Sequence, residues 1–95
     1  MNKYEFCIVF KPSLEEEALK AELDKVVGYI QNLDGTIDKV DSWGKRRLAY
    51  EIQKTNEGFY YFITFTSGSE TPSALEKRVR ILETVLRYLI IRIDV

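Results

Sequence analysis

The fold of this chain depends on one stretch, FYYFITFT at residues 59–66. Every side chain in it is aromatic or β-branched, and such side chains fit a pleated strand better than a helix. The stretch is therefore predicted to be a β-strand. The segments on either side of it indicate which kind of sheet it belongs to.

The residues before this strand predict the other arm of a β-hairpin. Residues 36–53 form a long strand, but the apolar alternation of 48–52 (LAYEI) is out of phase with Trp43. A change of phase requires an extra residue, and Gly44 permits the β-bulge that supplies one. The polar segment 54–58 (KTNEG) is predicted to be the turn of the hairpin.

Two further strands are predicted near the ends of the chain. Residues 4–10 (YEFCIVF) carry apolar side chains at both sets of alternating positions, which favours a strand in the centre of a sheet. Residues 86–93 are rich in β-branched and aromatic side chains and form the predicted last strand.

The first helix is predicted to begin at Ser13, because Ser13 and Glu16 have the spacing of a capping box. Gly35 is its predicted left-handed stop. Between them lies one apolar stripe at helical spacing: Leu19, Leu23, Val26, Val27 and Ile30.

The second helix has two possible starts. Either Thr71 is the cap with Pro72 at the first helical position, or Ser73 caps in a box with Glu76. The helix is predicted to end near Glu83, where β-branched and aromatic residues take over.

The predicted order of elements is β-α-β-β-α-β in a single domain, residues 1–95. Two right-handed crossovers that share one antiparallel sheet give an α+β, ferredoxin-like split β-α-β fold. Both helices cover one face of its four-stranded sheet. The opposite face is predicted to be left for another role.

Charge is unevenly distributed along a chain whose net charge is only −1. Residues 11–38 carry three cations against seven anions, whereas residues 39–54 and 76–92 each carry five cations against two anions. Local potential, not net charge, governs the encounter with a polyanion. The acidic average therefore does not exclude nucleic-acid binding.

Catalysis and cofactor binding find little support in the residues. The chain has no histidine, and its one cysteine, Cys7, lies in an apolar run and is predicted to be core filler. The carboxylates at 15–17 point about 100° apart around a helix, so we interpret them as helix-start charges. We expect no enzyme activity, catalytic residue, cofactor, metal or small-molecule substrate.

Two features suggest the cellular location. A lone thiol is typical of a reducing compartment. Residues 1–10 lack the pattern of a signal peptide, and the chain has no apolar stretch of membrane-spanning length. We therefore expect a cytoplasmic protein with no membrane partner.

The basic run Lys45-Arg46-Arg47 has two readings of equal weight. Cations on an exposed edge strand prevent aggregation, whereas arginine also suits bidentate contact with phosphate. On a strand, Lys45 and Arg47 point one way and Arg46 the other. Phosphate binding is favoured if the fold brings a second basic segment near the first. That segment contains Arg80, Arg87 and Arg92.

Aromatic residues on the predicted central strands suggest a rival function, a free single-stranded-RNA module that stacks bases on its sheet. Its third-strand signature is matched weakly, since Glu57 replaces a cation and Phe65 falls one position late, on the opposite face. This rival assigns stacking to Tyr4, Phe59 and Tyr61. A small-molecule regulatory domain is a more distant alternative, because ferredoxin-like sheets also host such sites.

The whole chain resembles a known family. Residues 43–52 (WGKRRLAYEI) are similar to the signature of the bacterial small-ribosomal-subunit protein six. That signature has Trp or Leu, Gly, two variable or basic positions, a polar or cationic residue, then Leu-Ala-Tyr-x-Ile. The strand at 4–10, the Glu-Gly-Phe start of the next hairpin arm and the ending at 85–90 (VLRYLI) resemble the family too.

The resemblance implies a non-enzymatic ribosomal protein that serves translation as a structural component of the small subunit. It implies binding to 16S ribosomal RNA in the central domain, or platform, together with small-subunit protein eighteen. Together with the basic segments, it suggests as RNA-binding residues Tyr4, Lys45, Arg46, Arg47, Lys54, Arg80, Arg87 and Arg92. The suggested partner-binding residues are Trp43, Leu48, Tyr50 and Tyr88.

Two departures from the family pattern bear on these expectations. Glu51 stands where the family often has proline, which places a carboxylate beside the cations. Many members extend beyond the position of Val95, so contacts made by such a tail are expected to be absent or replaced. Because the cations are few, we expect weak RNA binding by the chain alone and strong binding only with the partner.

Overall fold

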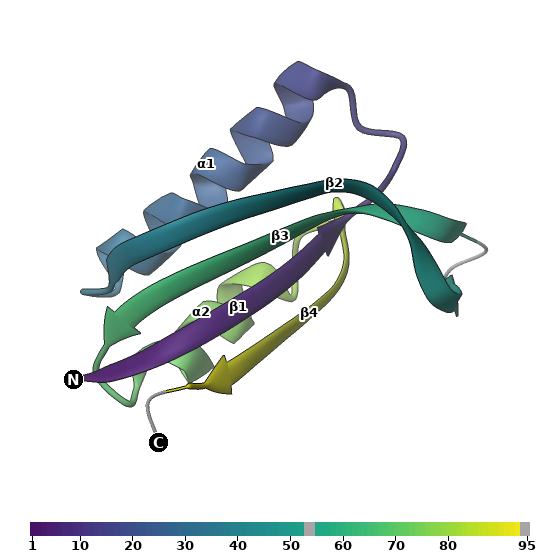
Figure 1. The fold of residues 1–95 in the computed structure, drawn as a ribbon. Coiled ribbons are helices and arrows are strands. Elements are labelled where there is room, and N and C mark those ends of the chain that lie inside the picture. The colour runs from purple at the N-terminus through teal and green to yellow at the C-terminus, as the bar shows by residue number, and fades with distance from the viewer. Residues whose placement is uncertain (53–54, 94–95) are drawn as a thin grey trace.

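The computed structural model describes residues 1–52 and 55–93, with the side chains of all of these except 49–52. The elements follow the predicted order β-α-β-β-α-β (Figure 1). Their bounds are β1 Asn2–Phe10, α1 Glu16–Asn32, β2 Thr36–Ile52, β3 Thr55–Ser67, α2 Thr71–Val79 and β4 Val85–Arg92.

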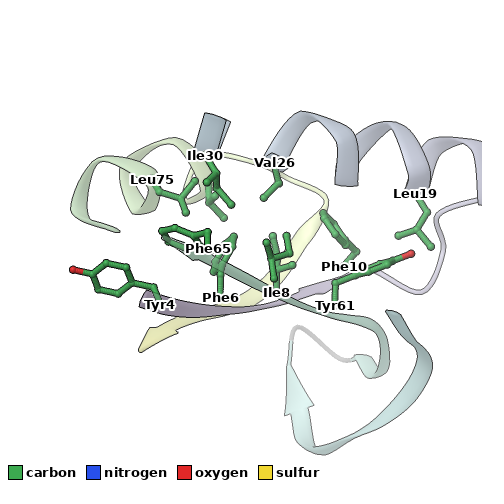
Figure 2. Packing of buried hydrophobic residues seen from close by; sticks show 12 residues of the cluster. Tyr4, Phe6, Ile8, Phe10, Leu19, Val26, Ile30, Tyr61, Phe65 and Leu75 are labelled. Carbon is green, nitrogen blue, oxygen red and sulfur yellow. The ribbon is translucent and has the colours of Figure 1, made fainter. Parts of the chain in front are cut away.

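The strands form one antiparallel sheet in the order β2-β3-β1-β4. As expected, β1 and β3 are central neighbours, and their register pairs Phe6 with Ile63 and Ile8 with Tyr61. Both helices lie on one side of the sheet, and Figure 2 shows side chains of the central strands pointing toward them. The ferredoxin-like α+β prediction is confirmed.

The main core lies between this face of the sheet and the helices. Phe6, Phe10 and Phe65 are completely buried in it, and α1 and α2 contribute Ile30 and Leu75. Burying an apolar side chain of this size stabilises the fold by about 1.5–3 kcal/mol. The even-numbered residues of β1 thus pack against the helices, while its odd-numbered residues point to the opposite face of the sheet.

The second arm of the hairpin, β3, is longer than predicted. Residues 55–58 were expected in the turn but belong to β3, where Glu57 and Gly58 lie opposite Arg47 and Arg46 of β2. The turn-like composition of KTNEG was misleading because pairing with β2 satisfies the backbone groups of these polar residues.

The start of α1 also differs from the prediction. The helix begins at Glu16 with Glu15 as its N-cap, and no side chain caps it, so the capping box at Ser13 is wrong. Leu14 instead packs against the same apolar cluster as Leu19. These two residues occupy the positions of a hydrophobic staple, so apolar packing takes precedence over the local capping signal.

The end of α1 is a Schellman turn. The Asp34 N–H donates to Gln31 O at 3.1 Å, and the Gly35 N–H donates to Ile30 O at 2.9 Å. The residue in the left-handed conformation is Asp34, with φ of 63°, and not Gly35 as predicted. Asp34 is therefore strained, and its carboxylate lies at the negative end of the helix dipole.

Replacing Asp34 by glycine is expected to raise the free energy of unfolding by about 1 kcal/mol, because it removes both the strain and the unfavourable charge. Asp34→Asn is the matched control: it removes the charge but keeps a side chain, so its gain should be smaller. Urea denaturation of the three proteins measures both values. A loss of stability in Asp34→Gly would contradict this account of the turn.

The start of α2 matches neither predicted cap. Thr71 is buried, and its hydroxyl donates to Leu33 O at 2.9 Å, at the end of α1. Glu70 is the N-cap, without a side-chain hydrogen bond. The helix ends at Val79, not near Glu83. The Thr71 hydroxyl thus donates to a carbonyl at the end of α1 and does not cap α2, the helix in which Thr71 lies.

Candidate functional site

The bulge predicted in β2 is present. Ser42 lies opposite Tyr61 and Gly44 lies opposite Tyr60, so Trp43 is the extra residue between them. Gly44 has a φ of 72°, a left-handed conformation that glycine adopts without strain. The phase change read from the sequence therefore has the expected cause.

Trp43 is displaced onto the face of the sheet opposite the helices. Its side chain is 53% exposed, and its ring lies 4.6 Å from the ring of Phe62, between centroids. Arg46 joins this pair: its Nε–H donates to Trp43 O at 2.8 Å, and its guanidinium carbon lies 5.6 Å from the Trp43 ring centroid. Indole, phenyl ring and guanidinium thus form one contiguous group.

The other two cations of the run follow the predicted alternation. Lys45 lies opposite Phe59, and its Nζ is 5.3 Å from the centroid of that ring. Arg47 lies opposite Glu57 and is exposed. Lys45 and Arg47 therefore leave the strand on one side and Arg46 leaves it on the other.

The hairpin bends toward the side away from the helices (Figure 2). A second apolar cluster forms on that side of the sheet. This cluster contains Val9, Leu48 and Leu86, with Tyr60 packed against it. Gly58 allows the close approach, since a Cβ there would lie 3.1 Å from Phe10 O and would overlap the side chain of Val9. Leu48, a suggested partner contact, is 6% exposed and serves this internal packing.

The second basic segment is only partly near the first. β2 and β4 form opposite edges of the sheet, so the two basic strands are not neighbours, and the arrangement that would have favoured phosphate binding is met only in part. Arg87, opposite Val9, lies at the same end as the hairpin run, whereas Arg92, opposite Tyr4, lies at the other end. Arg80 is the exposed C-cap of α2, in the helix layer. We call Lys45, Arg46, Arg47 and Arg87 the cationic end.

The sheet face away from the helices, the open face, has an apolar centre. Cys7 lies opposite both Phe62 and Leu89, and Ile91 follows two residues along β4. Leu89 and Ile91 are 53% and 44% exposed. The sites predicted from the sequence did not include Phe62, Leu89 or Ile91. The strand register turns these three side chains toward the same face of the sheet as Cys7.

Cys7 is therefore not core filler. It is a half-buried free thiol on the open face. Burial raises the pKa of the thiol, and nearby Arg87 partly opposes that rise. At neutral pH the group remains a thiol and packs as a small apolar side chain.

Two suggested contact residues belong to the helix side. The Tyr4 ring is 7% exposed and stacks on Phe65 at 5.5 Å, so it is closed to an RNA base. Tyr88 packs against the main core, and its hydroxyl donates to Glu76 Oε1 at 3.4 Å. Burial, followed by the Glu76 carboxylate, raises the pKa of Tyr88. Neither ring lies on the open face.

The aromatic residues assigned to base stacking lie on the same helix side. Tyr61 and Tyr4 are buried in the main core, and Phe59 packs against it. Their burial follows from the strand register, which turns odd-numbered residues of β3 toward the helices. Lys54 and the side chain of Tyr50, the remaining suggested contacts, lie outside the described residues.

Within residues 1–52 and 55–93, no group of three or more His, Cys, Asp or Glu is arranged to hold a metal ion. None of the helices in this described part is long and apolar enough to cross a membrane.

Comparison with known proteins gives a consistent result. The family described as Ribosomal protein S6 matches residues 3–92. The chain is 47% identical over 91 residues to small ribosomal subunit protein bS6 of Clostridium botulinum, covering 96% of this chain and 97% of that protein. It is 49% identical over 92 residues to bS6 of Clostridium perfringens, covering 97% of each.

Structural comparison agrees with the sequence matches. The crystal structure of 30S ribosomal protein S6 from Thermotoga maritima superposes with a TM-score of 0.93 at 32% identity. The match covers 97% of this chain and 87% of that chain.

Proposed function

Since the chain belongs to the ribosomal protein S6 family, whose members are non-enzymatic components of the small ribosomal subunit, we propose that it binds 16S ribosomal RNA directly. It does so in the central domain, or platform, and together with small-subunit protein eighteen. Residues 1–95 act as one ribosomal-protein domain, in the cytoplasm.

The observation that supports RNA binding is the separation of charge in the fold. The cationic end places Lys45, Arg46 and Arg47 on exposed positions of one hairpin, with Arg87 at the same end of the sheet. The acidic first turn of α1 lies in the helix layer. A phosphate backbone is attracted to the first region and repelled by the second, so the RNA contacts the hairpin and not α1.

The open face suits the protein partner. Leu89 and Ile91 are each about half exposed there, beside the half-buried Cys7 and Phe62. Apolar and aromatic side chains of this kind form the centre of protein interfaces, while charged side chains lie at the rim. Protein eighteen is proposed to cover this centre.

Co-sedimentation with small ribosomal subunits that lack the endogenous protein tests the proposed function. We expect weak binding of the chain alone, strong binding when protein eighteen is also added, and a steep loss as salt rises from about 50 to 200 mM. Tight binding of the isolated chain that does not respond to salt would overturn the proposal.

Replacing Leu89 by aspartate is expected to weaken binding to protein eighteen by at least about tenfold, roughly 1.4 kcal/mol, because it places an unpaired charge in the apolar centre. The cost in stability should stay within about 1 kcal/mol, since the side chain is exposed. Calorimetric titration with purified protein eighteen measures the affinity.

The matched control is Ile81→Asp, which introduces the same charge at an apolar residue 77% exposed in the connection between α2 and β4. Its affinity should stay unchanged. Equal losses in the two variants would show that protein eighteen does not use the open face.

A further inference from the structure

We propose that Trp43 and Arg46 form one phosphate-binding unit, in which the tryptophan holds the guanidinium for bidentate contact with an RNA phosphate. The inference rests on the proposed RNA binding and deepens it. It gives Trp43 a positioning role toward RNA, whereas the sequence had suggested a contact with the partner protein.

Two contacts restrain the guanidinium. Its Nε–H donates to Trp43 O at 2.8 Å, and its central carbon lies 5.6 Å from the Trp43 ring centroid. Arginine has five N–H donors in one plane, so the four on Nη1 and Nη2 remain for a ligand. The ion pairs found among the described side chains are Lys25–Glu22 and Lys39–Asp41, and neither involves Arg46.

The bulge makes this contact possible. In a regular strand, residues three apart point to opposite faces and lie about 10 Å apart along the strand. The extra residue and the φ of 72° at Gly44 reset the phase, so that the Trp43 carbonyl and the Arg46 side chain meet. Packing of the Trp43 ring on Phe62 at 4.6 Å anchors the unit to the sheet.

A fixed guanidinium favours phosphate, since less side-chain entropy is lost when two parallel N–H···O bonds form. The neighbouring charges favour phosphate over a protein carboxylate. Lys45 and Arg47 are exposed on the opposite side of the same edge strand from Arg46, and a polyanion that follows this edge of the sheet can contact all three cations. An isolated carboxylate would use only one of them.

The test is a double-mutant cycle on affinity for a transcript of the 16S central domain, in the presence of purified protein eighteen. Arg46→Gln should lower the affinity about tenfold and reduce the slope of log affinity against log salt by about 0.7–0.9, the value of one phosphate contact. Trp43→Leu should cost about two- to fivefold, the size of an exposed cation–π contact. In the Arg46→Gln background it should cost nothing more.

Fluorescence provides a direct readout, because Trp43 is the single tryptophan of the chain. Its emission should change in free Arg46→Gln and also when the transcript is added to the wild-type protein. The charge-matched control is Lys20→Gln, which removes an exposed cation from α1. This variant should leave the emission, the affinity and the salt slope unchanged. Melting temperatures of all variants confirm that they are folded.

The possible outcomes separate this inference from the proposed function. If the wild-type complex failed to bind the transcript, both the proposed function and the Trp43–Arg46 unit would be overturned. Wild-type binding with strictly additive losses, or with an unchanged salt slope in Arg46→Gln, would overturn the Trp43–Arg46 unit alone. The same is true if Arg46→Gln weakens only the affinity for protein eighteen, since the guanidinium would then meet a protein carboxylate.

Discussion

Replacing Phe65 by alanine is expected to lower the free energy of unfolding by about 3–5 kcal/mol, the usual cost of removing a buried phenyl ring. Phe65 is completely buried, lies in the central strand β3 and stacks on Tyr4 at 5.5 Å. Domains of this size are stable by only about 5–15 kcal/mol, so the variant should lose much of its stability. Chemical denaturation followed by circular dichroism measures the loss.

Phe62→Ala is the matched control on the same strand. Phe62 faces the other way, is half buried and packs against exposed Trp43. Its removal should cost clearly less, because the open face allows water to replace the lost ring and no closed cavity forms. Equal losses in the two variants would mean that the open face contributes as much to stability as the helix-covered core.

Replacing Lys45, Arg46 and Arg47 together by glutamine is expected to lower RNA affinity on the order of 100-fold or more at moderate salt. Three neighbouring phosphate contacts are removed, so the slope of log affinity against log salt should fall by about 2–3. The side chains are exposed, and stability should change by less than about 1 kcal/mol. Filter binding over a salt series, with protein eighteen present, measures both quantities.

The control removes an equal charge elsewhere. Lys11, Lys20 and Lys25 are the three cations of the acidic segment 11–38, and their replacement by glutamine leaves the cationic end intact. This variant should bind RNA nearly as well as the wild-type protein. If both triple variants lost affinity equally, the binding would depend on net charge and the cationic end would have no special part.

Much of the fold could be predicted because its signals are local. The aromatic and β-branched run at 59–66, the alternation of residues 4–10 and the phase change at Gly44 each reflect the backbone geometry of a few consecutive residues. The incorrect predictions concern the ends of elements. At Ser13 and Thr71 a local cap competed with packing or bonding to another element, and the nonlocal contact prevailed.

The candidate site was less predictable. The pattern around Gly44 predicted the bulge that displaces Trp43, but the spatial neighbours of Trp43 and of the cations could not be read from it. Arg87 and Arg92 lie only five positions apart, yet the register puts them at opposite ends of the sheet. Tyr4, Leu48 and Tyr88 were suggested as contacts, and each is engaged in packing inside the protein.

The order of the elements, the pairing of the central strands, the bulge and the family follow from the sequence alone, because periodicity, turn residues and a contiguous signature are properties of neighbouring residues. In contrast, it is the folded chain that sets which cations gather at one end, which aromatic residues remain exposed and how Arg46 is held. These depend on strand register and on the bend of the hairpin over Val9 and Leu86. Both arise from packing between residues far apart in the chain, which no local pattern records.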